Sequence, residues 1–147
     1  MKILPVLIIP FLFWGCSSLQ SKENKFLHEL SDIYTWIDLM PGGTPSFHMT
    51  GRLDIYSQDD VIIPYVSSMN IVVTQNGRTL FEFTPVYEYS TKKKDGVTAH
   101  LFSFHTLKRL LVTKLDIEKD ISIKCIFLID DVEYSTVKDS VIINKVY

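Results

Sequence analysis

Cysteine, glycine and proline are scarce in this sequence. Its 147 residues include two Cys, six Gly and six Pro. Two cysteines cannot build the disulfide framework of a small secreted scaffold, and so little Gly and Pro excludes a collagen-like or low-complexity chain. Basic residues are not in excess, since 15 Lys and Arg stand against 17 Asp and Glu. Nucleic-acid binding requires a concentrated basic surface, so we expect no nucleic-acid partner.

Signatures of catalysis and metal binding are also missing from the sequence. It contains no Gly-x-Ser-x-Gly and no His-Glu-x-x-His motif, which serve nucleophilic and zinc-dependent hydrolysis respectively. None of its histidines pairs at the His-x-His or His-x₃-His spacing typical of a zinc or copper site; they are His28, His48, His100 and His105. We therefore predict a protein that is not an enzyme and that holds no metal or dissociable cofactor.

Short segments rich in β-branched and aromatic residues fill most of the chain after residue 32. Turn residues bound nearly every segment, as is typical of a β-sandwich or barrel. Over residues 46–56 apolar side chains alternate with polar ones, so one face of this strand should be buried; the apolar positions are Phe47, Met49, Gly51, Leu53 and Ile55. The sequence predicts an all-β domain over residues 33–147, an antiparallel β-sandwich of about seven or eight strands.

Two-residue turns join three pairs of the expected strands, at Asn76-Gly77, Asp95-Gly96 and Asp130-Asp131. Asn, Asp and Gly accept the positive φ angles that such hairpin turns require. Counting outward from the second turn pairs Tyr89 with Phe102 and Tyr87 with Phe104. This register gathers four aromatic rings on one face, where cross-strand aromatic pairs stabilise a sheet.

The final hairpin has the form Ile-x-Ile-x-Cys-x-Phe over residues 121–127, followed by x-Tyr-x-Thr-x-Val. This pattern is similar to that of immunoglobulin-like and fibronectin-like domains, although the paired Cys and central Trp of true immunoglobulin domains are absent. The similarity is architectural and implies a sandwich fold but no function. Within this strand, Cys125 lies on the apolar face and should be a small buried hydrophobe rather than a reactive thiol.

Two segments leave alternatives open. Residues 105–120 fit either a short strand or a single helical turn, because several leucines have helical spacing whereas Leu-Val-Thr at 111–113 favours a strand. The last strand, over residues 140–147, alternates only weakly. It could lie at a sheet edge or beside the final hairpin.

The longest apolar run lies at the N-terminus. Residues 1–16 read MKILPVLIIPFLFWGC, in which one Lys precedes an apolar stretch that ends at Gly15-Cys16. The stretch is too short to span a bilayer and has the form of a signal peptide. It resembles the bacterial lipoprotein signal, in which a small residue precedes the Cys that receives the lipid. Phe13 and Trp14 differ from the Leu and the small residue that are usual at those positions.

The resemblance implies a signal peptide over residues 1–15 and a mature chain that begins at Cys16, modified with a diacylglycerol and an acyl chain. Residues 16–32 would form the lipidated tether. Membrane attachment would come from the lipid anchor, since a mildly acidic protein does not attract anionic headgroups. In this family a serine directly after the cysteine, here Ser17, implies sorting to the outer membrane. We therefore expect a membrane-anchored protein of the bacterial cell envelope.

The loop Asp-Leu-Met-Pro-Gly-Gly-Thr-Pro-Ser over residues 38–46 concentrates Pro and Gly between two expected strands. Because Pro restricts φ where Gly relaxes it, this composition predicts a shaped loop. One interpretation is a recognition loop, with contact residues Trp36, Met40, Pro41, Gly42, Gly43, Pro45 and His48. The alternative is an ordinary crossover between sheets, whose glycines only permit the bend.

The lipoprotein-like signal, the sandwich pattern and the lack of catalytic motifs favour a lipid-anchored binding or assembly module with an envelope protein as its partner. An exposed loop or a free edge strand could make that contact. The alternative is a protease inhibitor or a small-ligand carrier that presents the 40–46 loop. The sequence predicts no particular oligomeric state.

Overall fold

A computed structural model of the protein describes residues 26–57 and 65–147. Cys16, the expected signal peptide and most of the expected tether lie outside the described residues. The described residues form ten strands and no helix. The strands are β1 (Leu27–Asp38), β2 (Ser46–Ser57), β3 (Val66–Gln75), β4 (Arg78–Phe83), β5 (Val86–Lys94), β6 (Val97–His105), β7 (Leu110–Leu111), β8 (Ile121–Ile129), β9 (Val132–Val141) and β10 (Ile143–Val146).

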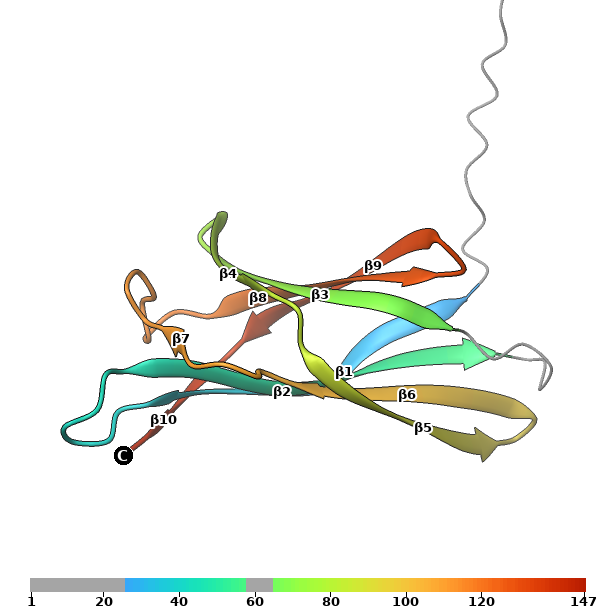
Figure 1. Ribbon diagram of the computed structural model, residues 1–147, viewed down its shortest axis with the longest axis horizontal. Coiled ribbons are helices and arrows are strands. Elements are labelled where there is room, and N and C mark those ends of the chain that lie inside the picture. Colours follow the sequence, from blue (N-terminus) through green and yellow to red (C-terminus); the bar gives the residue numbers. More distant parts are fainter. Residues whose placement is uncertain (1–25, 58–64) are drawn as a thin grey trace, which may run out of the picture.

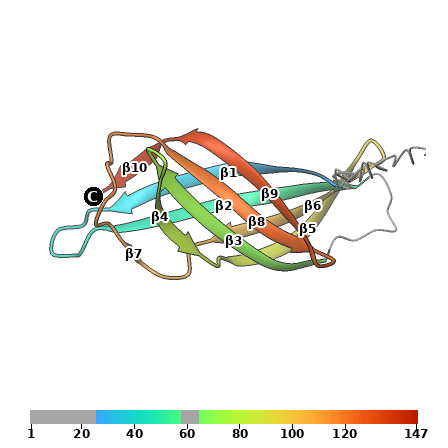
Figure 2. The same cartoon turned by 90° about the horizontal axis from the view of Figure 1, so that it is seen from above.

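The strands build two sheets that pack face to face (Figures 1 and 2). Sheet A has the order β10-β1-β2-β6-β5, with the short β7 beside β2, and sheet B has the order β4-β3-β8-β9. Neighbouring strands run antiparallel except β1 and β10, which run parallel. The predicted all-β sandwich is confirmed. There are ten strands rather than seven or eight, partly because the segment after residue 105, expected as either a short strand or a helical turn, contributes β7.

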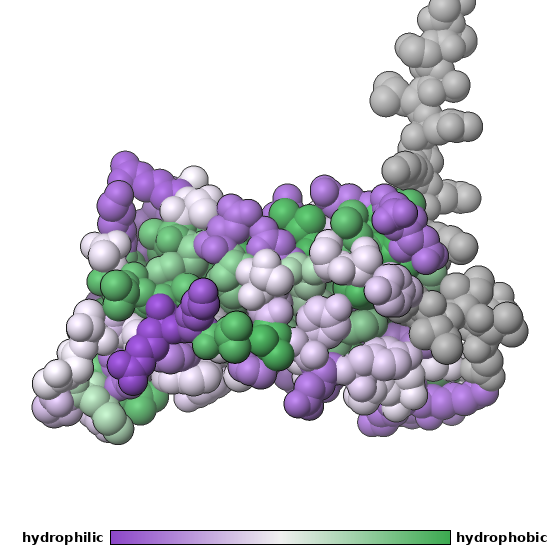
Figure 3. Space-filling view, viewed as in Figure 1, coloured by the Kyte–Doolittle hydropathy of each residue, from purple (hydrophilic) through white to green (hydrophobic). Residues whose placement is uncertain are grey.

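The hydrophobic core fills the space between the two inner faces. Alternate residues of β2 and β8 supply much of it and are almost fully buried: Phe47, Met49, Leu53, Ile55, Ile121, Ile123, Cys125, Phe127 and Ile129. Burying one large apolar side chain contributes about 1.5–3 kcal/mol. In Figure 3, hydrophobic side chains gather mainly between the sheets and hydrophilic ones along their outer borders. The alternation read from residues 46–56 therefore identifies the inner face correctly.

The thiol of Cys125 lies in this core. It is 0% exposed, and burial raises its pKa to about 12. Because only the thiolate attacks or binds a metal, a buried neutral thiol is inert. The prediction that Cys125 is a small buried hydrophobe is confirmed.

The three predicted hairpins form with the predicted turns, as β3–β4, β5–β6 and β8–β9. The first residue of each turn has a positive φ, at 52° for Asn76, 52° for Asp95 and 49° for Asp130. In the second hairpin Tyr89 pairs with Phe102, and their ring centroids lie 5.1 Å apart. Turn chemistry therefore specifies the register of these pairs.

The first strand begins at Leu27, inside the segment expected to be a tether. Phe26, just before the strand, and Leu30 within it are both buried in the core. His28 lies between them, and the centroid of its ring is 5.2 Å from that of Phe127. These residues belong to the folded domain. The prediction of a linker is therefore wrong for residues 27–32.

A β-bulge explains why this part of β1 was not recognised. The register with β2 shifts between Ser31 and Tyr34, and Asp32 in between has a φ of 49°. Before the shift even-numbered residues face inward, and after it the buried residues are Thr35 and Ile37. An extra residue in one strand reverses its two faces, so no single alternation runs through β1.

Glycine at position 51 accommodates the bulge from the inner side. A Cβ atom on Gly51 would lie 2.4 Å from Cδ1 of Ile33 and 2.7 Å from Cζ of Phe104. Real Cβ atoms do not come so close to other carbon atoms, so a larger residue would displace both side chains. Ile33, next to the bulge, packs into space that only glycine leaves open.

The C-terminal strand β10 lies at the edge of sheet A, one of the two placements that the sequence left open. After Val141 the chain passes from sheet B to sheet A and runs parallel to the end of β1. Thr35 donates its hydroxyl to the Ile142 carbonyl at 2.8 Å, and the side-chain amide of Asn144 donates to the Thr35 carbonyl at 2.9 Å. These side-chain bonds fasten β10 to β1.

The segment between β6 and β8 consists of turns around the two-residue β7. Gln75 is 5% exposed, and its side chain holds the second half of this segment through hydrogen bonds to the backbone. The Gln75 amide nitrogen donates to the carbonyls of Asp116 and Lys119 at 2.8 and 3.0 Å, and the amide oxygen accepts from the Asp116 N–H at 2.9 Å. A buried amide thus satisfies backbone groups that neither a helix nor a long strand satisfies here.

Two histidines on the inner face of sheet A, His28 and His100, flank Ile55 in the strand register. Burial lowers the pKa of both imidazoles. The His100 Nδ1 pairs with the Tyr89 hydroxyl at 2.9 Å, but Nε2 of His100 and Nδ1 of His28 are buried without a hydrogen-bond partner in the described part of the chain. The core therefore holds both rings in their neutral form.

We expect the free energy of unfolding to fall as the pH drops below 6.5, the ordinary pKa of histidine. The unfolded chain binds protons in this range that the folded core excludes, so acid favours unfolding. Urea unfolding measured between about pH 7.5 and 5.5 tests this, since the carboxylates of Asp and Glu titrate mostly below that window. A variant with His28→Gln and His100→Gln is the control and should show a shallower pH dependence; equal slopes would contradict neutral burial.

Candidate functional site

Aromatic side chains line the outer face of sheet A near one end of the sandwich. Trp36 of β1 and His48 of β2 lie directly opposite each other in the register, and their rings stack with centroids 5.3 Å apart and planes at 15°. Tyr34, two residues before Trp36 on the same face, places its ring centroid 5.6 Å from that of Trp36. We call these three residues the aromatic row.

The structure thus brings together two of the predicted contact residues, Trp36 and His48. Tyr34 is not among the predicted contact residues, although a period of two places it on the face of Trp36. It is 51% exposed, which is high for an aromatic ring. The side chain of Ser46 supports the row, because its Oγ lies 3.0 Å from Nε2 of His48.

The contact between Ser46 and His48 resembles half of a hydrolytic site but is not placed for catalysis. A nucleophilic hydroxyl must reach a substrate, whereas Ser46 is 1% exposed. The side chain of Asp38, the residue opposite Ser46 in the register, accepts the backbone N–H of Met40 at 3.0 Å. Ser46 therefore fixes the orientation of the imidazole.

The Pro-Gly loop, residues 39–45, joins β1 to β2 and projects from the end of the sandwich (Figure 1). It connects neighbouring strands of one sheet, so the alternative interpretation as a crossover between sheets is wrong. Its tip is a turn in which the Gly43 N–H donates to the Met40 carbonyl at 3.1 Å and Gly42 has a φ of 84°. With Pro41 in second place and Gly42 in third, this is a type II turn.

Both bases of the loop are held by other parts of the chain. The Leu39 N–H donates to the Val146 carbonyl of β10 at 2.8 Å, and the Val112 N–H donates to the Pro45 carbonyl at 3.4 Å. Met40 is 58% exposed at the start of the turn. The loop is therefore a shaped and anchored projection at the end of the strand pair that carries the aromatic row.

A hollow of about 450 Å³ lies on the outer face of sheet A next to the aromatic row. Its polar lining comes from four neighbouring strands, β1, β2, β6 and β5, and consists of Asp32, Thr50, Arg52, Glu88, Ser103 and His105. Thr50 forms part of its floor and lies opposite Tyr34 on one side and His105 on the other. The hollow was not predicted, because it requires the register of four strands.

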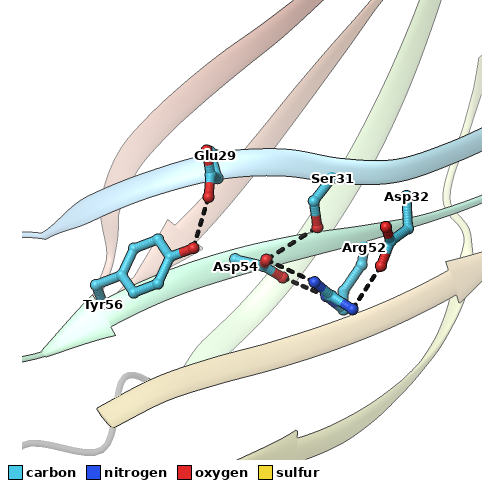
Figure 4. A network of polar contacts seen from close by, with 6 residues as sticks. All are labelled: Glu29, Ser31, Asp32, Arg52, Asp54 and Tyr56. Atoms are coloured by element: carbon cyan, nitrogen blue, oxygen red, sulfur yellow. Dashed lines mark hydrogen bonds and ion pairs between the residues drawn. The ribbon is translucent and has the colours of Figure 1, made fainter. Parts of the chain in front are cut away.

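A network of charged and polar groups fixes one wall of the hollow (Figure 4). Arg52 donates to both oxygens of Asp54, from Nε at 2.6 Å and Nη2 at 3.0 Å, and its Nη1 lies 2.6 Å from Asp32. The Ser31 hydroxyl also donates to Asp54 at 2.9 Å. Hydrogen bonding to Asp54 raises the pKa of Arg52. All three nitrogens of the guanidinium are engaged, so its charge is balanced within the protein.

The network continues along β1 and β2 with a second pair. The Tyr56 hydroxyl donates to Glu29 at 2.5 Å, and this bond raises the pKa of Tyr56 to about 12. Asp54 lies between the two pairs and is 3% exposed although it belongs to the outer face. A buried carboxylate with three donors is a fixed structural charge.

No cluster of three or more His, Cys, Asp or Glu side chains that could hold a metal occurs within residues 26–57 and 65–147. The four histidines separate by face: His28 and His100 point into the core, and His48 and His105 lie on the outer face.

Comparison of the chain with protein-family models, curated proteins and solved structures finds no match.

We expect Asp54→Asn to destabilise the domain by about 2 kcal/mol, because it leaves the half-buried Arg52 without its principal partner. Asp32→Asn is the matched control. It removes the other carboxylate from the same guanidinium, but Asp32 is 69% exposed, so the loss should stay below about 1 kcal/mol. Urea unfolding of both variants measures the difference, and equal losses would show that Asp54 is not the structural centre of the network.

Proposed function

We propose that the protein is a lipid-anchored module of the bacterial cell envelope that binds an envelope protein through the Pro-Gly loop and the aromatic row. The placement of this site relative to the N-terminus carries the proposal. β1 runs from Leu27 at one end of the sandwich to Asp38 at the other, where the loop projects (Figure 1). Twelve extended residues span roughly 40 Å. A tether before Leu27 would hold the site away from the membrane.

The anchor itself is inferred from the sequence. Cys16 follows the apolar run of the lipoprotein-like signal and would carry a diacylglycerol and an acyl chain, and Ser17 supports sorting to the outer membrane. In the described part of the chain, no helix is long and apolar enough to cross a membrane. The sequence supports attachment through acyl chains at Cys16.

Binding, rather than catalysis, agrees with the chemistry of the outer face. Within the described residues, the serine–histidine contact on this face places the hydroxyl of Ser46 out of reach of a substrate. Tyr34 is exposed and Trp36 is half-buried. Accessible aromatic rings beside an anchored loop are typical of recognition surfaces, because they contribute a large contact area at low cost in conformational entropy.

A protease inhibitor is the second candidate function, and the loop geometry favours it over a ligand carrier. The type II turn and the hydrogen bonds at both bases hold Met40 and Pro41 in one conformation, as an inhibitory loop requires. A carrier of an apolar molecule would need a large internal cavity, whereas the space between the sheets is filled by buried side chains such as Phe47, Met49 and Phe127.

Cys16→Ala should move the protein from the membrane fraction to the soluble fraction of cells, since it removes the atom that carries the lipid. Cell fractionation followed by immunodetection measures the distribution. Cys125→Ala, which removes the buried cysteine, is the control and should leave the protein with the membrane. Membrane association that survives in Cys16→Ala would contradict the anchor.

Trp36→Ala should reduce capture of an envelope protein by roughly tenfold, because it removes the central ring of the aromatic row. The measurement is chemical cross-linking in intact cells, followed by quantitative mass spectrometry of the captured proteins. Tyr65→Ala is the control, since Tyr65 is 70% exposed and lies at the other end of the sandwich. Equal reductions in both variants would exclude the aromatic row as the contact, and a captured protease would favour the inhibitor.

A further inference from the structure

The two outward-facing aromatic residues of β1 have different neighbours on β2. Trp36 lies opposite His48, whose imidazole stacks on the indole. Tyr34 lies opposite Thr50, whose side chain is too small to cover a ring. Tyr34 is accordingly 51% exposed, and Thr50 forms part of the floor of the hollow. His48 covers the ring of Trp36. A ligand ring bound in the hollow would cover the ring of Tyr34 in the same way.

The rest of the hollow carries groups that bond hydroxyls. Ser103 and Thr50 each offer a hydroxyl, Glu88 offers a carboxylate and His105 an imidazole. Hydrogen-bond donors and acceptors therefore surround the floor on the side away from Tyr34. A volume of about 450 Å³ lies within the usual range of small-ligand sites.

The charges of the hollow disfavour an anionic ligand. The charge of Arg52 is balanced by Asp54 and Asp32, which leaves Glu88 as a further negative group. A phosphate or a carboxylate would meet net negative charge at close range. The ligand should therefore be neutral or cationic.

A neutral ligand fits better than a cationic one. An ammonium or guanidinium group binds most strongly when several aromatic faces surround it. Phe104, the aromatic residue in the lining of the hollow, is 2% exposed, and the face of Trp36 is covered by His48. Tyr34, opposite Thr50, is the aromatic residue that this face leaves exposed beside the hollow. Lys92 lies on the same face of β5 as Glu88, four residues further along the strand. Its positive charge also disfavours a cationic ligand. A sugar ring, which has an apolar C–H face and hydroxyl groups around its edge, matches one aromatic wall and several polar groups.

We propose that this hollow binds a hexose ring of a neutral saccharide. The apolar face of the sugar packs on Tyr34 above Thr50, and its hydroxyls bond to Glu88, Ser103 and His105. The inference rests on the proposed function in one respect, that the outer face of sheet A is the binding surface. It adds a second ligand class beside the protein partner of the Pro-Gly loop.

The test uses the full-length chain with Trp14→Phe, which leaves Trp36 as the only tryptophan. Its emission is followed during titration with cellohexaose, maltohexaose and chitohexaose, three neutral oligosaccharides. We expect a saturable change with at least one of them, because Trp36 contacts Tyr34. Hexalysine is titrated in parallel as a cationic peptide.

Three variants identify the binding surface. Tyr34→Ala should weaken binding roughly tenfold or more, whereas Tyr34→Phe, which keeps the ring, should stay within about twofold of the parent. Tyr65→Ala is the control and should bind like the parent. Urea unfolding of each variant verifies folding, which the exposed position of Tyr34 should preserve.

The proposal is overturned if none of the three oligosaccharides gives saturation, if Tyr34→Ala binds as tightly as the parent, or if hexalysine binds in their place. If the sugars fail to bind while Trp36→Ala still reduces partner capture in cells, the saccharide proposal is overturned and the proposed function stands. Failure of both experiments would remove the outer face as a binding surface.

Discussion

The β-bulge in β1 is the constraint on which both the core and the candidate binding surface depend. Before the bulge the strand buries its even-numbered residues, including Leu30, and after it the odd-numbered ones, including Ile37. Without the extra residue the first phase would continue, which would send Trp36 into the core and Ile37 to the solvent. Arg52 holds the bulge from outside through its ion pair with Asp32. One backbone irregularity therefore determines which face of sheet A carries aromatic rings.

The parts of the fold that follow from the sequence are those that neighbouring residues specify. Asn76-Gly77, Asp95-Gly96 and Asp130-Asp131 predict three hairpins because a two-residue turn fixes the register of the strands on both sides. The start of β1 is different, since the bulge breaks the alternation by which a strand is recognised. The parallel pairing of β1 with β10 joins the first and the last strand of the domain, which are far apart in the sequence. No turn connects these two strands, so no local sequence signal predicts that they pair.

The same distinction applies to the candidate site. Trp36 and His48 are predictable as neighbours of a distinctive loop, and the strand register brings them into contact. The hollow depends on four strands at once and on the small size of Thr50 and Ser103. Small residues on an outer face leave no pattern in the sequence. Their significance appears only when the larger side chains around them are in place.

The course of β1 also has a mechanical consequence. If the proposed function holds, a lipid tether would pull this strand from its first residue, while a partner held at the Pro-Gly loop would resist at its last. Along its length β1 is bonded to β2 on one side, and near its end to β10 on the other. Both forces would act on the two ends of one extended strand, so the tension would run along its covalent backbone without having to break these hydrogen bonds. In the proposed module, the strand that links the anchor to the site would therefore carry tension between the membrane and a bound partner.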